Sequence, residues 1–357
     1  MKHATSPCVM SAPAFDDHEH VSFFRDAESG LSAIVAIHTT APFGIAGGGC
    51  RMWPYASDAE ALHDALRLSR AMSYKLALCD MPAGGAKSVV IGDPRRDKTE
   101  ALLLALGRMV ERLGGKYIIA EDVGTTEADM RVIGRETRYV VGRQTDTGPA
   151  TAYGAYLGLK EGAARVFGTP DLSGRSIAVQ GLGGVGRRLA GHLAREGARL
   201  VVADVNDAAV RAVVDEYGAR ASSPAAILAQ EVDIVAPCAL GGVLDDESIP
   251  KLSCKLVAGG ANNQLAEERH ADALAGRGIL FLPDFILNAG GVIGASQEGM
   301  TLGGGEGGYD ESIAFKDTER VATLTRQAIE RAARDGTHVY AAAIAMAKDK
   351  IAERKRG

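Results

Sequence analysis

The 357-residue chain contains few aromatic residues and little clustered positive charge. Phe, Trp and Tyr make up 5% of it, the formal net charge is −5, and the only run of three basic residues is 354–356. Nucleic-acid-binding proteins place Lys and Arg against phosphates and stack bases on aromatic rings. The composition therefore argues against a nucleic-acid partner.

Cysteine is also sparse, with five residues scattered along the chain and no C-x-x-C pair. An odd number without paired spacing disfavours a disulfide framework or a zinc site and is typical of reduced thiols in a cytosolic protein. The histidines show no metal-ligand spacing, and we expect His18 and His20 to be solvated residues of an N-terminal tail. No apolar run is long enough to span a membrane and no signal peptide is visible, so we expect a cytoplasmic protein.

Hydrophobic residues make up 46% of the chain, which is typical of a globular protein. The 44 glycines indicate many tight turns, and the length suggests two domains. In the first half, apolar periodicity predicts helices over 58–78, over 98–113 and from about 127, and strands over 31–38, 88–92 and 116–120. Asp97, with Glu100 three residues on, is the expected N-cap of the second helix. A helix over 147–168 carries the chain into its second half.

Strands and helices alternate from Gly174 onward. We predict strands over 176–180, 199–204, 232–236, 255–259 and 279–283, and helices over 184–196, 206–217, 311–335 and 338–354. This alternation is typical of a doubly wound parallel sheet, so the fold class is α/β. Residues 299–310 are rich in glycine and are expected to form a flexible loop.

A glycine-rich turn follows the first of these strands, with Gly181, Gly183 and Gly186 in the G-x-G-x-x-G pattern. Such glycines allow a tight turn, close approach of a pyrophosphate, and close packing of the helix, whose N-terminus binds phosphate. Asp204, at the end of the next strand, would bind ribose hydroxyls and repel a 2′-phosphate, which favours NAD over NADP. A second match at 303–308 follows no strand, and we interpret it as loop. The alternative for the first match is a glycine-rich turn without a nucleotide.

Three stretches of the first half are hard to explain by packing, GGGCRM (47–52), 72–94 and AEDVGTT (120–126). The second holds Lys75 and Lys87, twelve residues apart, and the third holds Asp122 just after a predicted strand. Lys87 follows the expected turn PAGGA and precedes an apolar strand, so a partly buried position is expected. Burial lowers the pKa of a lysine, and a lysine can then serve as a general acid and base near neutral pH. The alternative is two solvated surface lysines.

These stretches, with TGPATAYG (147–154), PCALGG (237–242), GGANNQL (259–265) and PDFILNAGGVI (283–293), resemble the Glu/Leu/Phe/Val dehydrogenase family, especially its leucine and phenylalanine dehydrogenase branch. The resemblance implies an N-terminal α/β domain over 1–147 for substrate binding and oligomerisation. It implies a Rossmann-type NAD-binding domain over 148–337 and a C-terminal helix, about 338–357, that packs back on the first domain. It also implies a homo-oligomer.

The same resemblance implies roles for individual residues. Lys75 binds the substrate carboxylate beside the backbone of Gly48 and Gly49. Lys87 activates the water that attacks an imine, and Asp122 shuttles protons as ammonia is released. Asn288 orients substrate or cofactor, with a turn-forming asparagine as the alternative. The implied NAD contacts, of which Thr151 and Asn262 would hold the nicotinamide, are Thr151, Gly181, Gly183, Gly184, Val185, Gly186, Asp204, Val205, Cys238, Ala239 and Asn262. For Cys238 we favour a core thiol over a nucleophile.

Side-chain specificity, by the same resemblance, depends on Gly47, Ala120, Val292 and Ala295. Glutamate-specific relatives carry a lysine and a serine where this chain has Gly47 and Ala295, so no cation awaits a side-chain carboxylate, whose burial would be strongly unfavourable. The small residues favour phenylalanine or another bulky apolar amino acid, and leucine or valine is the alternative.

Ala86 departs from the family pattern, in which the turn before the second lysine usually ends GGGK. If this position required a positive φ or close contact with substrate, Ala86 would strain or crowd the site. A protein of another class, an NAD-binding regulator with impaired turnover, is therefore the further alternative.

Overall fold

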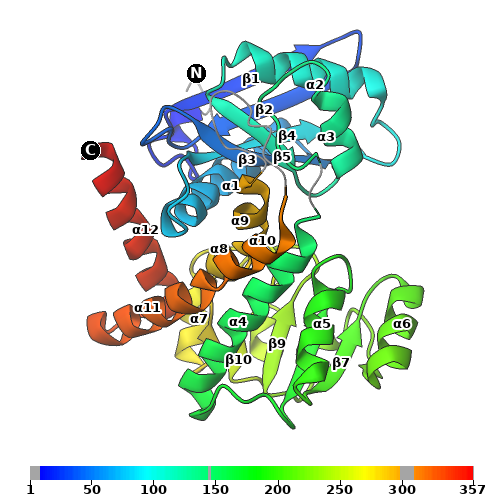
Figure 1. The fold of residues 1–357 in the computed structure, drawn as a ribbon, viewed down its shortest axis with the longest axis vertical. Coiled ribbons are helices and arrows are strands. Elements are labelled where there is room, and N and C mark those ends of the chain that lie inside the picture. The colour runs from blue at the N-terminus through cyan, green and yellow to red at the C-terminus, as the bar shows by residue number, and fades with distance from the viewer. Residues whose placement is uncertain (1–8, 144–145, 298–308, 357) are drawn as a thin grey trace, which may run out of the picture. The chain divides into compact units, whose positions relative to one another are not determined.

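The computed structural model describes residues 9–143, 146–297 and 309–356, and these form two compact units (Figure 1). The first unit contains the chain up to Asp146, residues 295–297, Tyr309 and the chain from Asp349 onward; the second contains Thr147–Gly294 and Asp310–Lys348. The glycine-rich segment predicted over 299–310 lies almost wholly outside the described residues. In the described part of the chain, no helix is long and apolar enough to cross a membrane.

The first unit is built on a five-stranded mixed sheet with the order β1-β2-β4-β3-β5. Its strands are β1 (His20–Asp26), β2 (Leu31–Ile37), β3 (Ala46–Trp53), β4 (Gly84–Ile91) and β5 (Tyr117–Glu121). β3 runs parallel to β4 and β5, whereas β2 is antiparallel to both β1 and β4. The glycine-rich stretches at 47–49 and 84–85 are therefore strand, and the prediction of a turn before Lys87 is wrong.

Close packing explains why these strand positions are glycine. A Cβ on Gly84 would lie 1.9 Å from the carbonyl oxygen of Thr39, and one on Gly85 would lie 2.0 Å from the backbone nitrogen of Ser73. Ser73 belongs to helix α1 (Asp58–Leu78), so the helix lies directly on β4. Neither contact leaves room for a side chain.

Helices cover both faces of this sheet. α1 is capped by Ser57, and α2 (Glu100–Arg112) is capped by Thr99, whose hydroxyl accepts the Leu102 N–H at 3.2 Å. The predicted cap at Asp97 is therefore wrong, because the Asp97 carboxylate instead binds the Asp93 N–H and Arg96. α3 (Glu127–Ile133) begins with a capping box made by Thr126 and Asp129. α2 packs over the core that contains Ala86, Val90 and Ile119.

The segment before β2 differs from the prediction of a solvated tail. It forms the edge strand β1, and His18 just before it is only 8% exposed. The His18 Nε2 atom lies 2.9 Å from the hydroxyl of Ser69 and 3.1 Å from the carbonyl oxygen of Leu66, both in α1. The expectation holds for His20, which is exposed.

The second unit contains a parallel six-stranded sheet in the order β11-β10-β9-β6-β7-β8. Its strands are β6 (Ser176–Gln180), β7 (Arg199–Ala203), β8 (Arg220–Ala221), β9 (Ile234–Pro237), β10 (Leu256–Val257) and β11 (Leu280–Phe281). The strand order reverses between β6 and β9, as the doubly wound prediction requires. In open α/β sheets, ligands bind at such a switch point, at the carboxyl ends of the strands.

The helices of this unit are α4 (Gly148–Phe167), α5 (Gly186–Arg195), α6 (Asp207–Tyr217), α7 (His270–Gly276), α8 (Asp284–Leu287), α10 (Glu311–Thr318) and α11 (Arg320–Asp335). The helix α9 (Gly290–Ser296) begins in this unit, and its last two residues belong to the first. The single helix predicted over 311–335 is divided at Glu319 into α10 and α11. Short 3-10 helices lie at Val9–Ser11, Ile227–Ala229 and Ile249–Lys251. α5 and α6 pack on β7, and α4 contacts β10 (Figure 1).

The last helix, α12 (Val339–Arg356), ends in the first unit. There Lys350 Nζ lies 2.7 Å from the Asp80 carboxylate, and Arg354 donates hydrogen bonds to the carbonyl oxygens of Leu76 and Ala77. These carbonyls belong to the last turn of α1, where the helix dipole favours positive charge. The basic end of the chain is thus bound to the carboxyl end of α1.

Candidate active site

Lys87 lies inside β4 and points to the face of the sheet that α1 covers. Side chains alternate between the two faces along a strand. Val89, two residues on, packs in one buried cluster with Ala61 and Leu66 of α1, whereas Ala86 belongs to the opposite core. Lys87 itself is 4% exposed. The strand therefore holds the Lys87 side chain almost out of contact with solvent.

The partner of this lysine is Asp122, the first residue after β5. Lys87 Nζ lies 3.0 Å from Asp122 Oδ2, and the two side chains are 5% and 9% exposed. Solvent ions screen a buried pair much less than a surface pair. The structure thus brings together two residues that the sequence separates by 35 positions.

The loop that carries Asp122 is fixed against β3. The Asp122 N–H donates to the Thr125 hydroxyl at 2.9 Å, and this hydroxyl donates to the Cys50 carbonyl oxygen at 2.8 Å. Gly124 has φ +82°, and a Cβ there would lie 2.2 Å from the carbonyl oxygen of Met52. In the motif AEDVGTT, the end of β5, the glycine at 124 and the hydrogen bonds of the Thr125 hydroxyl together orient Asp122.

Arg51 is a second cation on the same carboxylate, and sequence reasoning did not identify it. Its Nε lies 3.0 Å from Asp122 Oδ2, and its Nη1 lies 3.0 Å from Asp64 Oδ2. Tyr55 also donates its phenolic hydrogen to Asp64, at 2.7 Å. Arg51 pairs in register with Val89, so it lies on the same face of the sheet as Lys87. The motif GGGCRM contains Arg51, but nothing in the motif indicates its partners, which lie 13 and 71 positions away in the sequence.

These contacts decide the charge of Asp122. Burial opposes ionisation, but Lys87 and Arg51 together outweigh it and hold the pKa of the carboxyl well below its usual range. Asp122 is therefore an ionised acceptor at neutral pH. Burial raises the pKa of the Cys50 thiol to about 12 and that of the Tyr117 phenol well above its usual value, so both neighbours are neutral.

Gly48 and Gly49 bring the β3 backbone against this pair. A Cβ on Gly48 would lie 1.7 Å from the Ala86 carbonyl oxygen, and one on Gly49 would lie 2.7 Å from the Glu121 carbonyl oxygen. The Gly48 carbonyl accepts a hydrogen bond from the Tyr117 hydroxyl at 2.9 Å. Both glycines are thus required for the strands to meet where Lys87 and Asp122 lie.

Lys75 and Ala86 have different environments. Lys75 lies in the last turn of α1 and is 7% exposed, so it is not the solvated lysine of the alternative interpretation. Ala86 is fully buried in the core, on the face of β4 opposite Lys87. Among the described residues other than glycine, positive φ occurs at Asp17, Asp80 and Asn263, so Ala86 is unstrained. The positive φ that would strain Ala86 is therefore absent, and its contact with substrate stays a prediction.

The glycine turn of the second unit follows β6, at the switch point of the sheet. Gly181 has φ +90°, and a Cβ on Gly186 would lie 1.9 Å from the Gly181 carbonyl oxygen, so both positions require glycine. A Cβ on Gly183, by contrast, would meet no atom within 4 Å. Gly184 and Val185 complete the turn, and α5 begins at Gly186. The open backbone at Gly183 leaves room for a pyrophosphate at the start of a helix.

Asp204, directly after β7, binds this turn. Its carboxylate accepts the Leu182 N–H at 2.6 Å and the Asn206 N–H at 2.8 Å. Val205, the next residue, is 90% exposed. A carboxylate for ribose hydroxyls, beside an apolar surface, fits the adenosine end of NAD.

The loops after β9 and β10 border the same turn. A Cβ on Gly181 would lie 2.7 Å from the Ala239 Cβ, and the Gly260 N–H points to the Cys238 sulfur at 3.5 Å. Burial raises the pKa of the Cys238 thiol to about 11. The thiol therefore stays protonated at neutral pH, which agrees with a packing role.

Asn288 contains an orphaned polar atom. Its Nδ2 donates to Asn262 Oδ1 at 2.8 Å, whereas its Oδ1 is buried and has no hydrogen-bond partner within the described chain. A buried acceptor without a partner is rare and is consistent with a ligand donor, such as a carboxamide or amine. Thr151, on α4, donates its hydroxyl hydrogen to the Thr147 carbonyl oxygen at 2.7 Å and keeps acceptor capacity. These amides and the open turn fit NAD.

The four positions expected to determine specificity lie on three elements. Gly47 is buried in β3, and Ala120 lies in β5 opposite Gly49. Val292 is half-buried and Ala295 buried, both in α9. All four residues are small or apolar, and none carries a charge.

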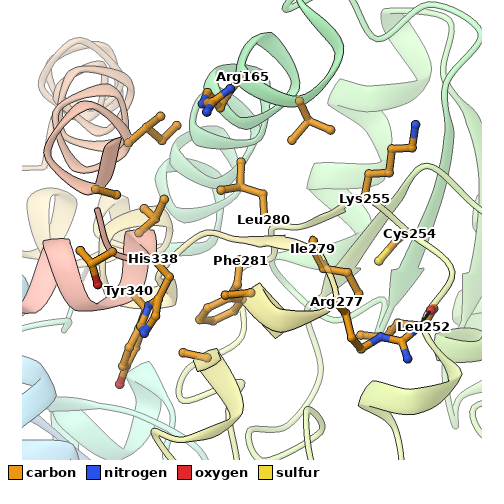
Figure 2. A pocket seen from close by; sticks show the side chains of 18 of the residues that line it. Arg165, Leu252, Cys254, Lys255, Arg277, Ile279, Leu280, Phe281, His338 and Tyr340 are labelled. Atoms are coloured by element: carbon orange, nitrogen blue, oxygen red, sulfur yellow. Dashed lines mark hydrogen bonds between the residues drawn. The ribbon is translucent and has the colours of Figure 1, made fainter. Parts of the chain in front are cut away.

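A pocket of about 750 Å³ lies elsewhere in the second unit (Figure 2). Its lining includes residues that precede β10 and β11, at the amino ends of these strands. Phe281 and Tyr340 also line it, with their ring centroids 5.9 Å apart. The labelled cations Arg165, Lys255 and Arg277 point in different directions in Figure 2. None of the predicted site residues lines it, so it is not a candidate for the active site.

Comparison with known proteins gives a consistent result. The model of the Glu/Leu/Phe/Val dehydrogenase dimerisation domain matches residues 18–139, and that of Glutamate/Leucine/Phenylalanine/Valine dehydrogenase matches residues 204–357. A leucine dehydrogenase of Bacillus cereus is 48% identical over 95% of this chain and 92% of its own length. A valine dehydrogenase of Streptomyces coelicolor is 44% identical over 94% and 93%. The crystal structure of L-tryptophan dehydrogenase from Nostoc punctiforme superposes with a TM-score of 0.78 at 41% identity, over 95% of this chain and 97% of that one.

Proposed function

Because the chain belongs to the Glu/Leu/Phe/Val dehydrogenase family, we propose that it catalyses the reversible oxidative deamination of a branched-chain L-amino acid, leucine or valine, to its 2-oxo acid and ammonia. It is an amino-acid dehydrogenase that acts on a CH–NH₂ group of an apolar amino acid and uses NAD(H). The observation that carries the proposal is the buried Lys87–Asp122 pair beside the Gly48–Gly49 backbone.

Lys75, Lys87 and Asp122 are proposed to have different roles in the reaction. By the family resemblance, Lys75, which is buried in the last turn of α1, binds the α-carboxylate that all amino acids share. The ionised Asp122 accepts a proton from the substrate amine. Lys87 takes a proton from the water that adds to the α-carbon of the imine, and its ion pair with Asp122 Oδ2 gives that proton a path to the amine that leaves as ammonia.

When NAD is bound, its nicotinamide would supply the acceptor for the α-hydrogen of the substrate and its bonding electrons. The turn at 181–186 would hold its pyrophosphate, Asp204 its adenosine ribose, and Val205 would contact the adenine. The orphaned Oδ1 of Asn288 would accept a hydrogen bond from the nicotinamide carboxamide or the substrate amine.

A second candidate substrate is phenylalanine or another bulky apolar amino acid. Gly47 and Ala295 are the observation that favours it, because both leave room near the predicted side-chain position. The similarity to a tryptophan dehydrogenase supports the same direction. One methylene changes specificity by only about 1–3 kcal/mol, so activity on both classes is expected to overlap.

The test is a kinetic panel of 2-oxo acids with ammonia and NADH, run on the wild type and on Lys87→Ala. The highest kcat/KM on the oxo acids of leucine or valine, abolished in Lys87→Ala, is the expected result. The highest value on phenylpyruvate would favour the second candidate. If the protein binds NADH but oxidises it with none of the oxo acids, the result would favour the alternative of a regulatory NAD-binding protein.

We also propose a homo-oligomer, because the family model of the first unit is described as a dimerisation domain. Light scattering coupled to size-exclusion chromatography tests this. A mass of about 37.2 kDa would contradict it.

A further inference from the structure

We propose that Arg51 is a positioning residue for the deamination reaction, which holds the Asp122 carboxylate in place beside Lys87 and is itself held by Asp64. The inference rests on the proposed roles of Lys87 and Asp122. Arg51 was assigned no role by the sequence motifs.

The geometry of the guanidinium carries the argument. Arg51 Nε and Nη1 each lie 3.0 Å from a carboxylate oxygen, one on Asp122 and one on Asp64. The guanidinium is planar and its donors form a rigid fork, so two contacts to different carboxylates fix its orientation. The Asp122 oxygen that Arg51 contacts is also the one that Lys87 contacts. Asp122 is thus held at one oxygen from two sides.

Arg51 itself has little freedom to move. Its side chain is 16% exposed and that of Asp64 is 13% exposed. Asp64 also accepts the Tyr55 hydroxyl hydrogen at 2.7 Å, and Arg67 lies 3.6 Å from its other oxygen. The chain Tyr55–Asp64–Arg51–Asp122–Lys87 therefore connects the amino end of α1 to the site.

Charge balance explains why the site needs this second cation. The ionisable groups that face Asp122 come from β4, β3, β5, α1 and the loop before α1, and they are Lys87, Arg51, Cys50, Tyr117, Asp64 and Tyr55. Lys87 and Arg51 are the cations among them. When a proton leaves Lys87 during the reaction, Arg51 remains as the positive charge beside Asp122. The carboxylate then stays ionised at the step in which it must accept a proton.

The test compares four variants, Arg51→Met, Arg51→Lys, Arg67→Met and the double variant Arg51→Met/Asp64→Asn. Arg67→Met is the matched control, since Arg67 contacts Asp64 from α1 without contacting Asp122. The double variant removes the carboxylate that Arg51→Met leaves buried without its cation, so it tests the proposal if the single variant folds poorly. Steady-state kinetics against pH and an infrared titration of the Asp122 carboxyl, assigned with Asp122→Asn, are the readouts.

We expect Arg51→Met and the double variant to lower kcat by about 10- to 100-fold, with KM for the oxo acid within about threefold. The acid limb of kcat and the infrared midpoint of Asp122 should both move up by about one to two pH units. Arg51→Lys should restore the midpoint but only part of kcat, because an ammonium lacks the fork. In Arg67→Met, kcat and the infrared midpoint of Asp122 should stay near the wild-type values.

One result would overturn the role proposed for Arg51, and another would overturn the proposed function. If Arg51→Met lowers the melting temperature but leaves the Asp122 midpoint and the pH profile of kcat unchanged, Arg51 is structural only and the proposal is overturned. If the wild type turns over no amino acid, the proposed function fails, while the infrared titration of the unliganded protein still decides whether Arg51 controls Asp122.

Discussion

A Cβ on Gly49 would lie 2.8 Å from the Cβ of Asp122. The same atom would lie 3.2 Å from Lys87 Nζ, so Gly49 faces both members of the ion pair. Cβ atoms do not approach other carbons this closely without displacement. Strand β3 therefore sets the position of the pair through the absence of a side chain.

We predict that Gly49→Ala lowers kcat by about 10- to 100-fold, because displacement of reacting groups by about 1 Å has effects of this size. Steady-state kinetics with the preferred substrate, alongside thermal unfolding, gives the measurement. Gly276→Ala is the matched control, since a Cβ there meets no atom within 4 Å. An unchanged kcat in Gly49→Ala would show that the site tolerates a displaced pair.

The two glycines of the nucleotide turn are predicted to behave differently. Gly183→Ala should fold with stability within about 0.5 kcal/mol of the wild type, because its Cβ enters open space. It should weaken NAD binding, because this space is where the pyrophosphate is expected. Gly186→Ala should destabilise the unit by at least about 1–3 kcal/mol, because its Cβ would overlap the Gly181 carbonyl oxygen.

Calorimetric titration with NAD and denaturant unfolding separate these two effects. Wild-type NAD affinity in Gly183→Ala would place the pyrophosphate elsewhere. Wild-type stability in Gly186→Ala would contradict the close contact within the turn.

Acid is predicted to destabilise the first unit through the buried His18 and the half-buried His38. The rings of His18 and His38 lie 5.0 Å apart, centroid to centroid, and the His38 Nδ1 lies 2.8 Å from the Ser73 hydroxyl. Burial, and then the neighbouring His18, lower the pKa of His38 to about 4, against the opposing effect of Asp16; Arg70 and Lys355 lower it further. Burial also lowers the pKa of His18.

A histidine whose pKa is lowered by folding is neutral in the native state and takes up a proton on unfolding. Its stabilising contribution is therefore complete above about pH 6.5 and is lost as the pH falls towards 4. For His38 this amounts to about 2 kcal/mol between pH 7 and pH 5. Denaturant unfolding at the two pH values should show a smaller difference in His38→Gln than in the wild type, and an unchanged difference in His63→Gln, which alters an exposed residue of α1. Equal differences in all three would refute the histidine assignment.

The sequence predicted those parts of the site that depend on local pattern. Asp122 follows an apolar strand, and Gly181, Gly183 and Gly186 stand between a strand and a helix, so their positions follow from neighbours in the chain. The glycines before Lys87 misled the prediction, because a glycine required by packing between strands has the same composition signal as a glycine required by a turn.

Long-range pairs could not be predicted in this way. Arg51 contacts Asp122 across 71 positions, and His18 contacts Ser69 across 51. Without its partner, an arginine on a strand or a histidine near the N-terminus carries no local signal of burial. Their environments depend on the order of strands in the sheet, which periodicity does not determine.

The binding of Lys350 and Arg354 to the end of α1 has a practical consequence. The final turns of the polypeptide belong to the same unit as Lys75, Lys87 and Asp122. We therefore expect that shortening the carboxyl terminus, or fusing another protein to it, alters the unit that carries these three residues, although the terminus is far from them in the sequence.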